Sequence, residues 1–227
     1  MVTLMQIERG ICDRLQRGLG IAVSGVVSWD VMTNDIGVIL KRLPGAFVTF
    51  TGITGSHPHD TRRTRYKVSG NFAVYVADYS LRGNQAIRQG AARVDEPGCY
   101  RLVRAVRHLL MGQDLGLEIG RLAPTTVKMI TGQVFSQKAI GMYECQFSTF
   151  WYEDAMENGS WPVAPEYDTH PDHDFVLWKG QLDDAPREHR ATHAAWQLQG
   201  QPVADDTVLV PAKSKPESDA GEDGPLL

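Results

Sequence analysis

The run DEPGCYRLVRAVRHLLMG (95–112) constrains the fold most, because it is the clearest helical pattern in the chain. Its apolar residues recur at helical spacing, which places them on one face. They are Leu102, Val103, Val106, Leu109 and Leu110. Asp95 or Glu96 can cap the helix, and Pro97 suits its first turn. A helix with one apolar face must bury that face, so the chain needs a second layer for it to pack on.

The helical pattern ends abruptly within RHLLMGQDLGLEIGRL (107–122). Gly112 can take the left-handed conformation that terminates helices. Gln113 and Asp114 then form either a chemical site or the turn that joins two packed elements. No residue near Asp114 in the sequence would shift its pKa for acid catalysis, and short polar side chains readily bond to the backbone of a turn. We therefore predict a turn. The apolar residues predicted to be buried after it are Leu115, Leu117 and Ile119.

Other helical and strand patterns alternate up to residue 152. Apolar residues at helical spacing predict a helix over 3–18, with Thr3 as its N-cap and Gly18 as its stop. The run 33–45 predicts a short helix with Thr33 or Asn34 as its cap, ending before Pro44, and 84–93 is weakly helical. Runs of β-branched or alternating residues predict strands over 20–29, 46–53, 63–80, 125–135 and 138–152.

The polar stretch TGSHPHDTR (54–62) separates two of the predicted strands. We expect these strands to pair as a hairpin with a wide tip. In the last predicted strand Tyr143, Cys145 and Phe147 share a face that we predict to be core. The order of elements predicts an α+β domain over 1–152, in which helices pack on a mainly antiparallel sheet.

Beyond residue 152 the pattern changes. Residues 153–200 are rich in Pro, Gly, Asn and Asp, and predict a loop-rich extension with a short strand at 175–180 and a short helix at 183–200. Residues 201–227 carry six acids and two bases, and predict a largely disordered acidic tail.

The charge distribution excludes one class of function. The net charge is −4, and residues 201–227 account for all of it, which leaves 1–200 neutral. A nucleic-acid clamp driven by bulk charge is therefore not expected, although a local basic patch remains open. Charged residues interrupt the apolar N-terminal pattern and no long apolar stretch exists, so we expect a soluble chain with no signal peptide, no membrane partner and no membrane span. Cys12, Cys99 and Cys145 are predicted to be reduced, buried thiols.

Basic residues cluster in two places. In TRRTRYK (61–67), Arg63, Arg65 and Lys67 share one face if the strand alternates there, and Arg62 precedes them. This pattern indicates either a strand end protected from edge pairing or a contact with an acidic partner or passing nucleic acid. In the predicted helix, three arginines recur at every third position, which indicates either a solvated face or an acidic partner surface. They are Arg101, Arg104 and Arg107.

Two histidine clusters resemble metal sites. HPHD contains His57 and His59, and HPDHD contains His170 and His173. Imidazole and carboxylate ligands suit zinc or iron, so a metal-dependent hydrolase is an alternative function. Both clusters lie in proline-containing loops, where His, Pro and Asp are common turn residues, and metal ligands need rigid support. Sequence motifs for serine hydrolases, zincins and P-loop enzymes are missing. We therefore predict no enzyme, no metal and no cofactor.

The stretch from Tyr75 to Ile130 carries a family resemblance. An LRG segment at 81–83 is followed by GQDLGL at 112–117, and LPGAFVTFTG lies upstream. Over residues 1–152 this arrangement resembles the small Mu-like phage tail proteins encoded ahead of the contractile tail sheath, a family regarded as the tail terminator or tail-completion protein.

The resemblance implies a virion protein that acts by geometry without bond chemistry. A terminator of this kind forms a hexameric ring at the head-proximal end of the tail tube, stops growth of tube and sheath, and joins the tail to the head connector. Its partners would be further copies, the tube, sheath and neck proteins, and the DNA passing through the lumen, with assembly in the host bacterial cytoplasm. The two basic clusters are then candidates for interface or lumen residues. A head-completion or neck adaptor ring is the alternative within the same class.

Overall fold

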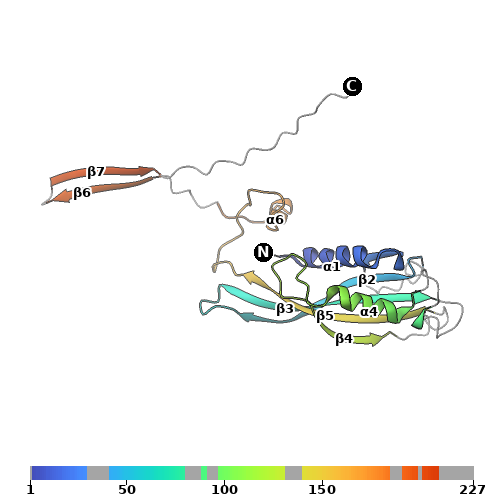
Figure 1. The fold of residues 1–227 in the computed structure, drawn as a ribbon. Coiled ribbons are helices and arrows are strands. Elements are labelled where there is room, and N and C mark those ends of the chain that lie inside the picture. The colour runs from blue at the N-terminus through green and yellow to red at the C-terminus, as the bar shows by residue number, and fades with distance from the viewer. Residues whose placement is uncertain are drawn as a thin grey trace, which may run out of the picture.

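The computed structural model describes residues 2–29, 41–79, 88–90, 97–130, 140–184, 191–198 and 201–209. Its main body is a five-stranded sheet in the order β1-β2-β3-β5-β4, covered on one face by two helices (Figure 1). The elements are α1 (Leu4–Leu19), β1 (Gly25–Ser28), β2 (Gly45–Pro58), β3 (Arg65–Tyr79), α4 (Cys99–Leu110), β4 (Ala123–Met129) and β5 (Ile140–Asp154). β1 runs parallel to β2 and the other pairs are antiparallel, which confirms the predicted α+β class.

The hairpin of β2 and β3 is longer than the sequence predicts. β2 pairs with β3 from Gly45↔Ala77 to Pro58↔Tyr66, so the predicted loop 54–62 is wrong for its first five residues. Polar residues continue the strand because they bond across it: Thr54 Oγ1 donates to the Ser69 carbonyl at 3.1 Å. Contacts between the two strands, such as this one, stabilise a hairpin whose side chains are exposed to solvent.

Helix α1 begins as predicted and ends later. The Thr3 hydroxyl accepts from the Gln6 amide, while the Gln6 side chain accepts from the Thr3 amide, which completes a capping box. The helix runs through Gly18 and its C-cap is Gly20. A Cβ at residue 18 would lie 2.5 Å from Leu109 Cδ2, so Gly18 permits close packing of α1 on α4 and is not a stop. After α1, Gly20–Ala22 form a 3-10 turn (η1), which shortens the strand predicted from residue 20.

Helix α4 begins after the predicted cap. Gly98 is the N-cap residue, with φ of 71°, and Pro97 precedes it. The buried carboxylate of Asp78 accepts from the Gly98 amide at 2.8 Å and from the Tyr79 amide at 2.7 Å. The prediction that Asp95 or Glu96 caps this helix, with Pro97 in its first turn, is therefore wrong, because Gly98 is the N-cap and Pro97 lies before it. A residue distant in sequence fixes this helix start.

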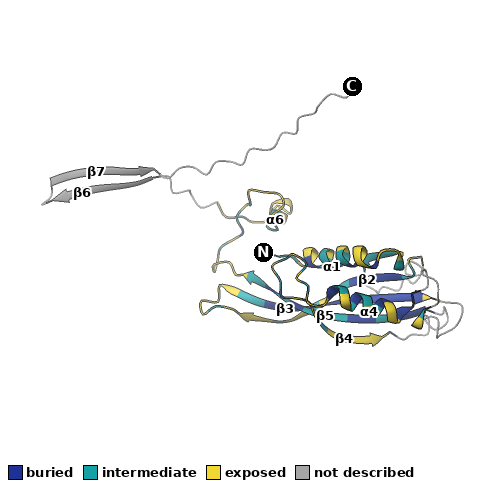
Figure 2. Ribbon diagram, viewed as in Figure 1, coloured by how far each residue is buried: buried dark blue, intermediate teal, exposed yellow. Residues whose placement is uncertain are grey.

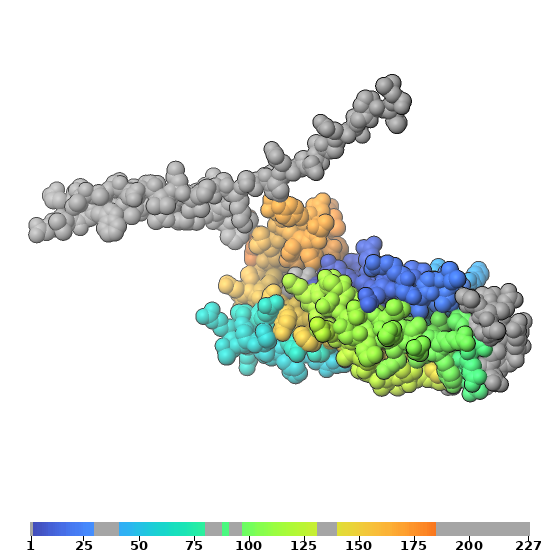
Figure 3. Space-filling model, in the orientation of Figure 1, coloured from blue at the N-terminus to red at the C-terminus, as the bar shows by residue number. Residues whose placement is uncertain are grey.

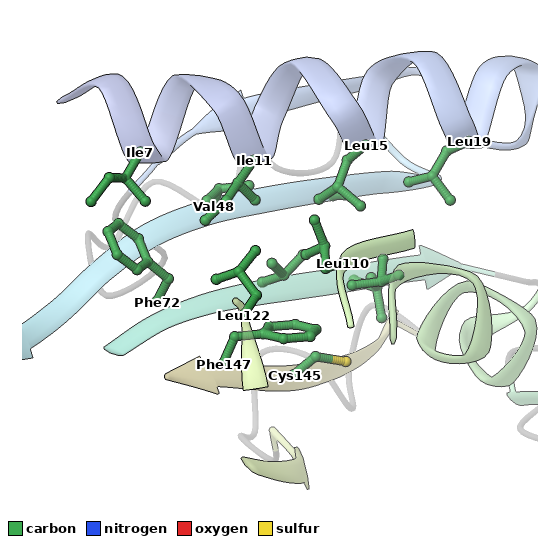
Figure 4. Packing of buried hydrophobic residues seen from close by; sticks show 14 of the residues in the cluster. Ile7, Ile11, Leu15, Leu19, Val48, Phe72, Leu110, Leu122, Cys145 and Phe147 are labelled. Atoms are coloured by element: carbon green, nitrogen blue, oxygen red, sulfur yellow. The ribbon is translucent and has the colours of Figure 1, made fainter. Parts of the chain in front are cut away.

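The main core lies between the helices and the sheet (Figure 4). The predicted apolar face of α4 is confirmed at Leu102, Val106 and Leu110, which are buried. Cys145 and Phe147 of β5 are fully buried against this core, as predicted, while Tyr143 is partly buried. The buried α1 residues are Ile7, Ile11, Leu15 and Leu19. Burying a side chain of this size contributes about 1.5–3 kcal/mol.

The other face of the sheet is also buried near its centre. A second apolar cluster contains Phe47, Ala73, Tyr75, Ala77, Ile140 and Met142. Much of the central strands is accordingly dark blue in Figure 2. Alternate residues of β5 therefore lie on two opposite faces of the sheet, and both faces are buried. The sequence predicted only one buried face.

The junction after α4 is a turn, as predicted. Gly112 has a φ of 76°, and its amide donates to the Leu122 carbonyl at 2.9 Å. The Leu122 amide donates to the Gln113 carbonyl at 2.8 Å, which closes the loop. The Asp114 carboxylate accepts from the Gly116 amide at 3.0 Å. The apolar residues after it pack against the main core, and they are Leu115, Leu117 and Ile119.

Two predictions beyond β5 are wrong. The strand predicted at 175–180 is instead the short helix α6 (His173–Leu177) with the turn that follows it. The helix predicted at 183–200 contains the strand β6 (Ala191–Leu198). In the tail, residues 201–209 form β7 (Gln201–Leu209), which pairs antiparallel with β6 as a separate sheet. The disorder predicted for the rest of the tail stays a prediction. The pairing of β6 with β7 outweighs the helix propensity of the alanines.

Several predicted segments fall outside the described residues. These are most of the helices at 33–45 and 84–93, the end of the strand at 125–135, the start of the strand at 138–152 and the tail from 210 to 227.

Candidate functional site

The hairpin tip is organised by one carboxylate. Asp60 accepts from the Thr64 amide at 2.9 Å, from the Thr64 hydroxyl and from the Arg65 amide at 3.3 Å. The hydrogen bond from the Thr64 hydroxyl is the main reason that the pKa of Asp60 lies below its usual range. These bonds hold the turn in which Arg63 adopts a left-handed φ of 57°.

The four basic residues of 61–67 divide into two pairs. Arg62 and Arg63 are exposed at the tip, outside the strands. Arg65 and Lys67 share one face of β3, as the alternation predicts, but Arg63 is not on that strand face because it lies in the turn.

Arg65 and Lys67, the two basic residues on β3, contact aromatic and acidic residues of β5. Arg65 Nε lies 3.5 Å from the Asp154 carboxylate, and its guanidinium lies 4.7 Å from the ring centre of Tyr152. Lys67 Nζ lies 3.9 Å from the ring centre of Phe150. Such exposed contacts contribute little stability each, but they hold the side chains in place. The charges free to meet a partner at this end are therefore those at the tip.

A cleft of about 390 Å³ opens beside this cluster. It is lined by Val2, Arg65, Glu118, Ile119, Phe150, Tyr152 and Asp154. It thus connects the hairpin end with the turn that follows α4. Apolar rings and charges of both signs share its walls, a composition suited to a protein contact.

The segment after β5 lies against the same end of the molecule. The Ala155 amide donates to the Thr64 carbonyl at 2.8 Å, which joins the extension to the hairpin tip. Figure 3 shows this segment, in orange, standing above the hairpin end of the domain. It exposes large apolar side chains, notably Trp178 at 70%, Leu177 at 64% and Trp161 at 48%. Sequence reasoning missed this surface, although four aromatic residues between 161 and 178 in an otherwise polar stretch were a usable signal.

The arginines of α4 lie on a second surface. Arg101 and Arg104 are exposed and Arg107 is half-buried, opposite the buried face of the helix. Within the part of the chain that the structure describes, none of the three forms an ion pair. A groove of about 480 Å³ runs along this face. Its lining combines apolar and basic residues, namely Tyr100, Val103, Arg104, Arg107, His108 and Met111.

The histidine clusters have local neighbours in the structure. His59 packs on Tyr152 with ring centres 4.7 Å apart, and His57 lies near the end of β2 opposite Lys67. His170 Nδ1 accepts from the Asp172 amide at 3.1 Å, and His173 Nδ1 lies 3.6 Å from the Asp168 carboxylate. Across the described ranges, no three His, Cys, Asp or Glu residues gather closely enough to hold a metal ion.

The cysteines are free thiols in this fold. Burial raises the pKa of Cys12 and of Cys145 to about 11 and that of Cys99 to about 12. A thiol with so high a pKa is a poor nucleophile at neutral pH.

The described helices include none that is both long and apolar enough to cross a membrane.

The sequence matches a family model described as Bacteriophage Mu, Gp37 over residues 3–152. The chain belongs to this phage family. The match begins just before α1 and ends within β5, so it covers the sheet and both helices of the main body. Membership of the Bacteriophage Mu, Gp37 family confirms the Mu-like family predicted from the sequence.

The other comparisons are more distant. Curated proteins include no match to this chain. Among solved structures, a chain from "Virion of native gene transfer agent (GTA) particle" aligns with 65% of this chain and 95% of its own length, at 15% identity and a TM-score of 0.40. A likeness this distant does not bear on function.

Proposed function

We propose that this protein is a structural component of a phage virion, and that it acts as the tail terminator. Membership of the Bacteriophage Mu, Gp37 family over the whole main body is the observation that carries this proposal. In this role copies of the chain form a ring, which we propose to be a hexamer, on the head-proximal end of the tail tube. The ring stops growth of the tube and sheath and joins the tail to the head connector.

The proposed mechanism is steric and involves no bond chemistry. One side of the ring complements the last ring of the tube, and the opposite side does not, so that growth ends. The surfaces described above suit such a role because they combine exposed apolar and charged groups over a rigid sheet.

Two parts of the chain have proposed places in the assembly. The hairpin tip, with Arg62 and Arg63 exposed, faces the lumen or a neighbouring ring, where it meets passing DNA or an acidic surface. The extension after β5, with Trp161 and Trp178 exposed, docks on an adjacent subunit, the sheath or the connector.

Tail tubes assembled with and without the protein test the proposed function. We expect the protein to bind one end of each tube in negative-stain images and to stop elongation when tube subunits are added. Tails formed without it should be over-long. Tubes that continue to elongate at bound ends would contradict the terminator role, and binding to the head connector without binding to tubes would favour a neck adaptor.

A further inference from the structure

The charges of the chain are divided between two of its parts. Residues 1–152, which contain the sheet and helices α1 and α4, carry eighteen Lys or Arg and eleven Asp or Glu, a net charge of +7. Residues 153–184 carry nine Asp or Glu and one Lys, a net charge of −8. The two charges nearly cancel, which is why residues 1–200 are neutral as a whole. A basic main body is therefore followed by a strongly acidic extension.

The acidic surface, here called the extension face, consists of the exposed residues of 155–184. Large apolar side chains lie among its acids, and Tyr167 and Trp178 are 54% and 70% exposed. In the part of the chain that the structure describes, Glu157, Glu166 and Asp174 form no ion pair. Exposed aromatic rings among charges of one sign suit a partner that offers a pocket and the opposite charge. The exposed acids are Glu157, Glu166, Asp168, Asp174, Asp183 and Asp184.

The basic surface, here called the α4 face, is the groove of about 480 Å³ on α4 together with Arg101. Helix α4 contains three arginines and no acidic residue. The next acids along the chain, Asp114 and Glu118, lie in the turn after the helix, and neither lines the groove. Tyr100 and Met111 are 46% and 49% exposed in it, so an apolar side chain has a surface to pack on. The α4 face therefore complements the extension face in charge while sharing its apolar character.

The two faces are not bonded to each other within one chain. The extension is held at its start, where the Ala155 amide donates to the Thr64 carbonyl at 2.8 Å. Across the described ranges, no hydrogen bond or ion pair joins 155–184 to helix α4. Figure 3 shows both on the outside of the chain, the extension in orange and α4 in green. The charged groups of each face are thus available to another molecule.

We infer that the extension face of one copy binds the α4 face of a second copy. The arginines of α4 meet the acids of the extension, and Trp178 enters the groove between Tyr100 and Met111. The contact joins two different surfaces of the same chain, so it is heterologous, and repetition through a constant rotation closes a ring. This inference rests on the proposed function, because it names the contact that holds neighbouring copies of the proposed ring together.

Charge decides which occupant the extension face takes. A segment with a net charge of −8 repels nucleic acid, so its partner is a basic protein surface. The main body of a second copy provides such a surface, with a net charge of +7 and an acid-free groove on α4. In a ring of identical copies this surface is present beside every extension.

Charge reversal in the full-length chain tests the contact. Arg101→Glu/Arg104→Glu changes the α4 face, and Glu166→Lys/Asp174→Lys changes the extension face. Each double variant should weaken self-association at least ~10-fold in sedimentation equilibrium. All four side chains are exposed, so circular dichroism should show an unchanged fold. The matched control is Arg9→Glu/Arg62→Glu, which makes the same change of charge elsewhere and should leave association unchanged.

Mixing the two variants distinguishes a contact between copies from one within a chain. In an equal mixture each reversed face meets the other reversed face on a neighbouring copy, so association should return. A chain that carries both reversals should also associate. Recovery in that chain without recovery in the mixture would place the contact within one chain and would overturn the inference. Because some rings form only on their target, the same samples are also compared for binding to tail tubes.

The aromatic part of the contact has its own test. Trp178→Ala should weaken self-association at least ~10-fold, because an aromatic side chain that fills a pocket carries much of the energy of an interface. Ile21→Ala is the control, since Ile21 is 86% exposed on η1, outside both faces, and its loss should have no effect. Native association of Trp178→Ala would overturn the docking of this ring in the groove.

The outcomes separate this contact from the proposed function. Rings that persist in both double variants and still stop tube growth would overturn the contact and leave the terminator role standing. Rings that are lost with either reversal and return in the mixture, but fail to stop tube growth, would support the contact and contradict the terminator role. If the extension variant forms rings but no longer binds tubes or the connector, another tail protein occupies the extension face, which would overturn the inference.

Discussion

Gly120 lies directly beneath the ring of Phe150. Its amide donates to the Phe150 carbonyl at 2.6 Å, and a Cβ at residue 120 would lie 2.3 Å from Cε1 of that ring. The turn after α4 and the last third of β5 therefore come together only because residue 120 has no side chain. The same ring supports Lys67 at the hairpin end.

Replacement of this glycine should disturb the hairpin end. Gly120→Ala forces the Phe150 ring from its position, and such overpacking costs about 1–3 kcal/mol. Chemical denaturation would measure the loss. Gly25→Ala is the control, because nothing lies within 4 Å of a Cβ at that position, and it should be nearly neutral. Equal stability of the two variants would rule out the close approach.

The capping box of α1 should be measurable in stability. Thr3→Ala removes the hydroxyl that accepts from the Gln6 amide, and loss of an N-cap of this kind costs about 1 kcal/mol. We expect a lower midpoint in thermal unfolding followed by circular dichroism. Thr61→Ala in the hairpin tip serves as the matched control. An unchanged midpoint for Thr3→Ala would mean that the box does not form in solution.

The order of the hairpin tip should depend on pH. The pKa of Asp60 is lowered, chiefly by the Thr64 hydroxyl, so the ionised carboxylate is the form that holds the turn. The sign follows from this shift: the contribution is present above the pKa of a free aspartate and is lost as the pH falls through the lowered value. An NMR titration of the Asp60 carboxyl should show the lowered pKa, and Thr64→Val should raise it. A carboxyl that titrates like a free aspartate in both proteins would contradict this account.

The thiols should react slowly while the protein is folded. Raising a thiol pKa from 9.0 to about 11, as burial does for Cys12 and Cys145, lowers the thiolate fraction at pH 8 about 100-fold. A disulfide reagent at pH 8 should therefore modify the native chain far more slowly than the chain unfolded in guanidinium. Cys12, which is only half-buried, should react first. Fast modification of Cys145 in the folded protein would place that residue outside the core.

The elements best predicted from the sequence are those set by local pattern. The apolar face of α4 and the Thr3 cap of α1 depend on residues within a few positions of each other, and both were predicted correctly. The turn at Gly112 likewise needs only a left-handed glycine after a helix. The main body therefore followed from periodicity and capping.

The errors have tertiary causes. Gly18 resembles a helix stop, but its role depends on Leu109, which lies 91 residues later in the chain. The cap of α4 is likewise tied to Asp78 on a strand and could not be found from neighbouring residues. Strand β2 continues through polar residues because β3 lies beside it, a partner that the sequence of β2 does not record.

The candidate surfaces were only partly visible in the sequence. The arginine spacing on α4 predicted a basic face, but not the groove between Tyr100 and Met111, which depends on how the helix lies on the sheet. Within 61–67, the basic residues on β3 differ from those at the tip because they contact side chains of β5. These side chains are Tyr152, Phe150 and Asp154. No spacing rule connects residues so far apart in the chain.

The single parallel pair in the sheet sets the relative direction of its two outer strands. Five strands that alternated throughout would leave both outer strands pointing the same way. Because β1 runs with β2, and every later neighbour reverses, β1 and β4 point in opposite directions. A strand that paired antiparallel with β1 would therefore run in the opposite direction to one that paired antiparallel with β4. A local detail near the N-terminus thereby determines the relative polarity of the two outer strands of the sheet.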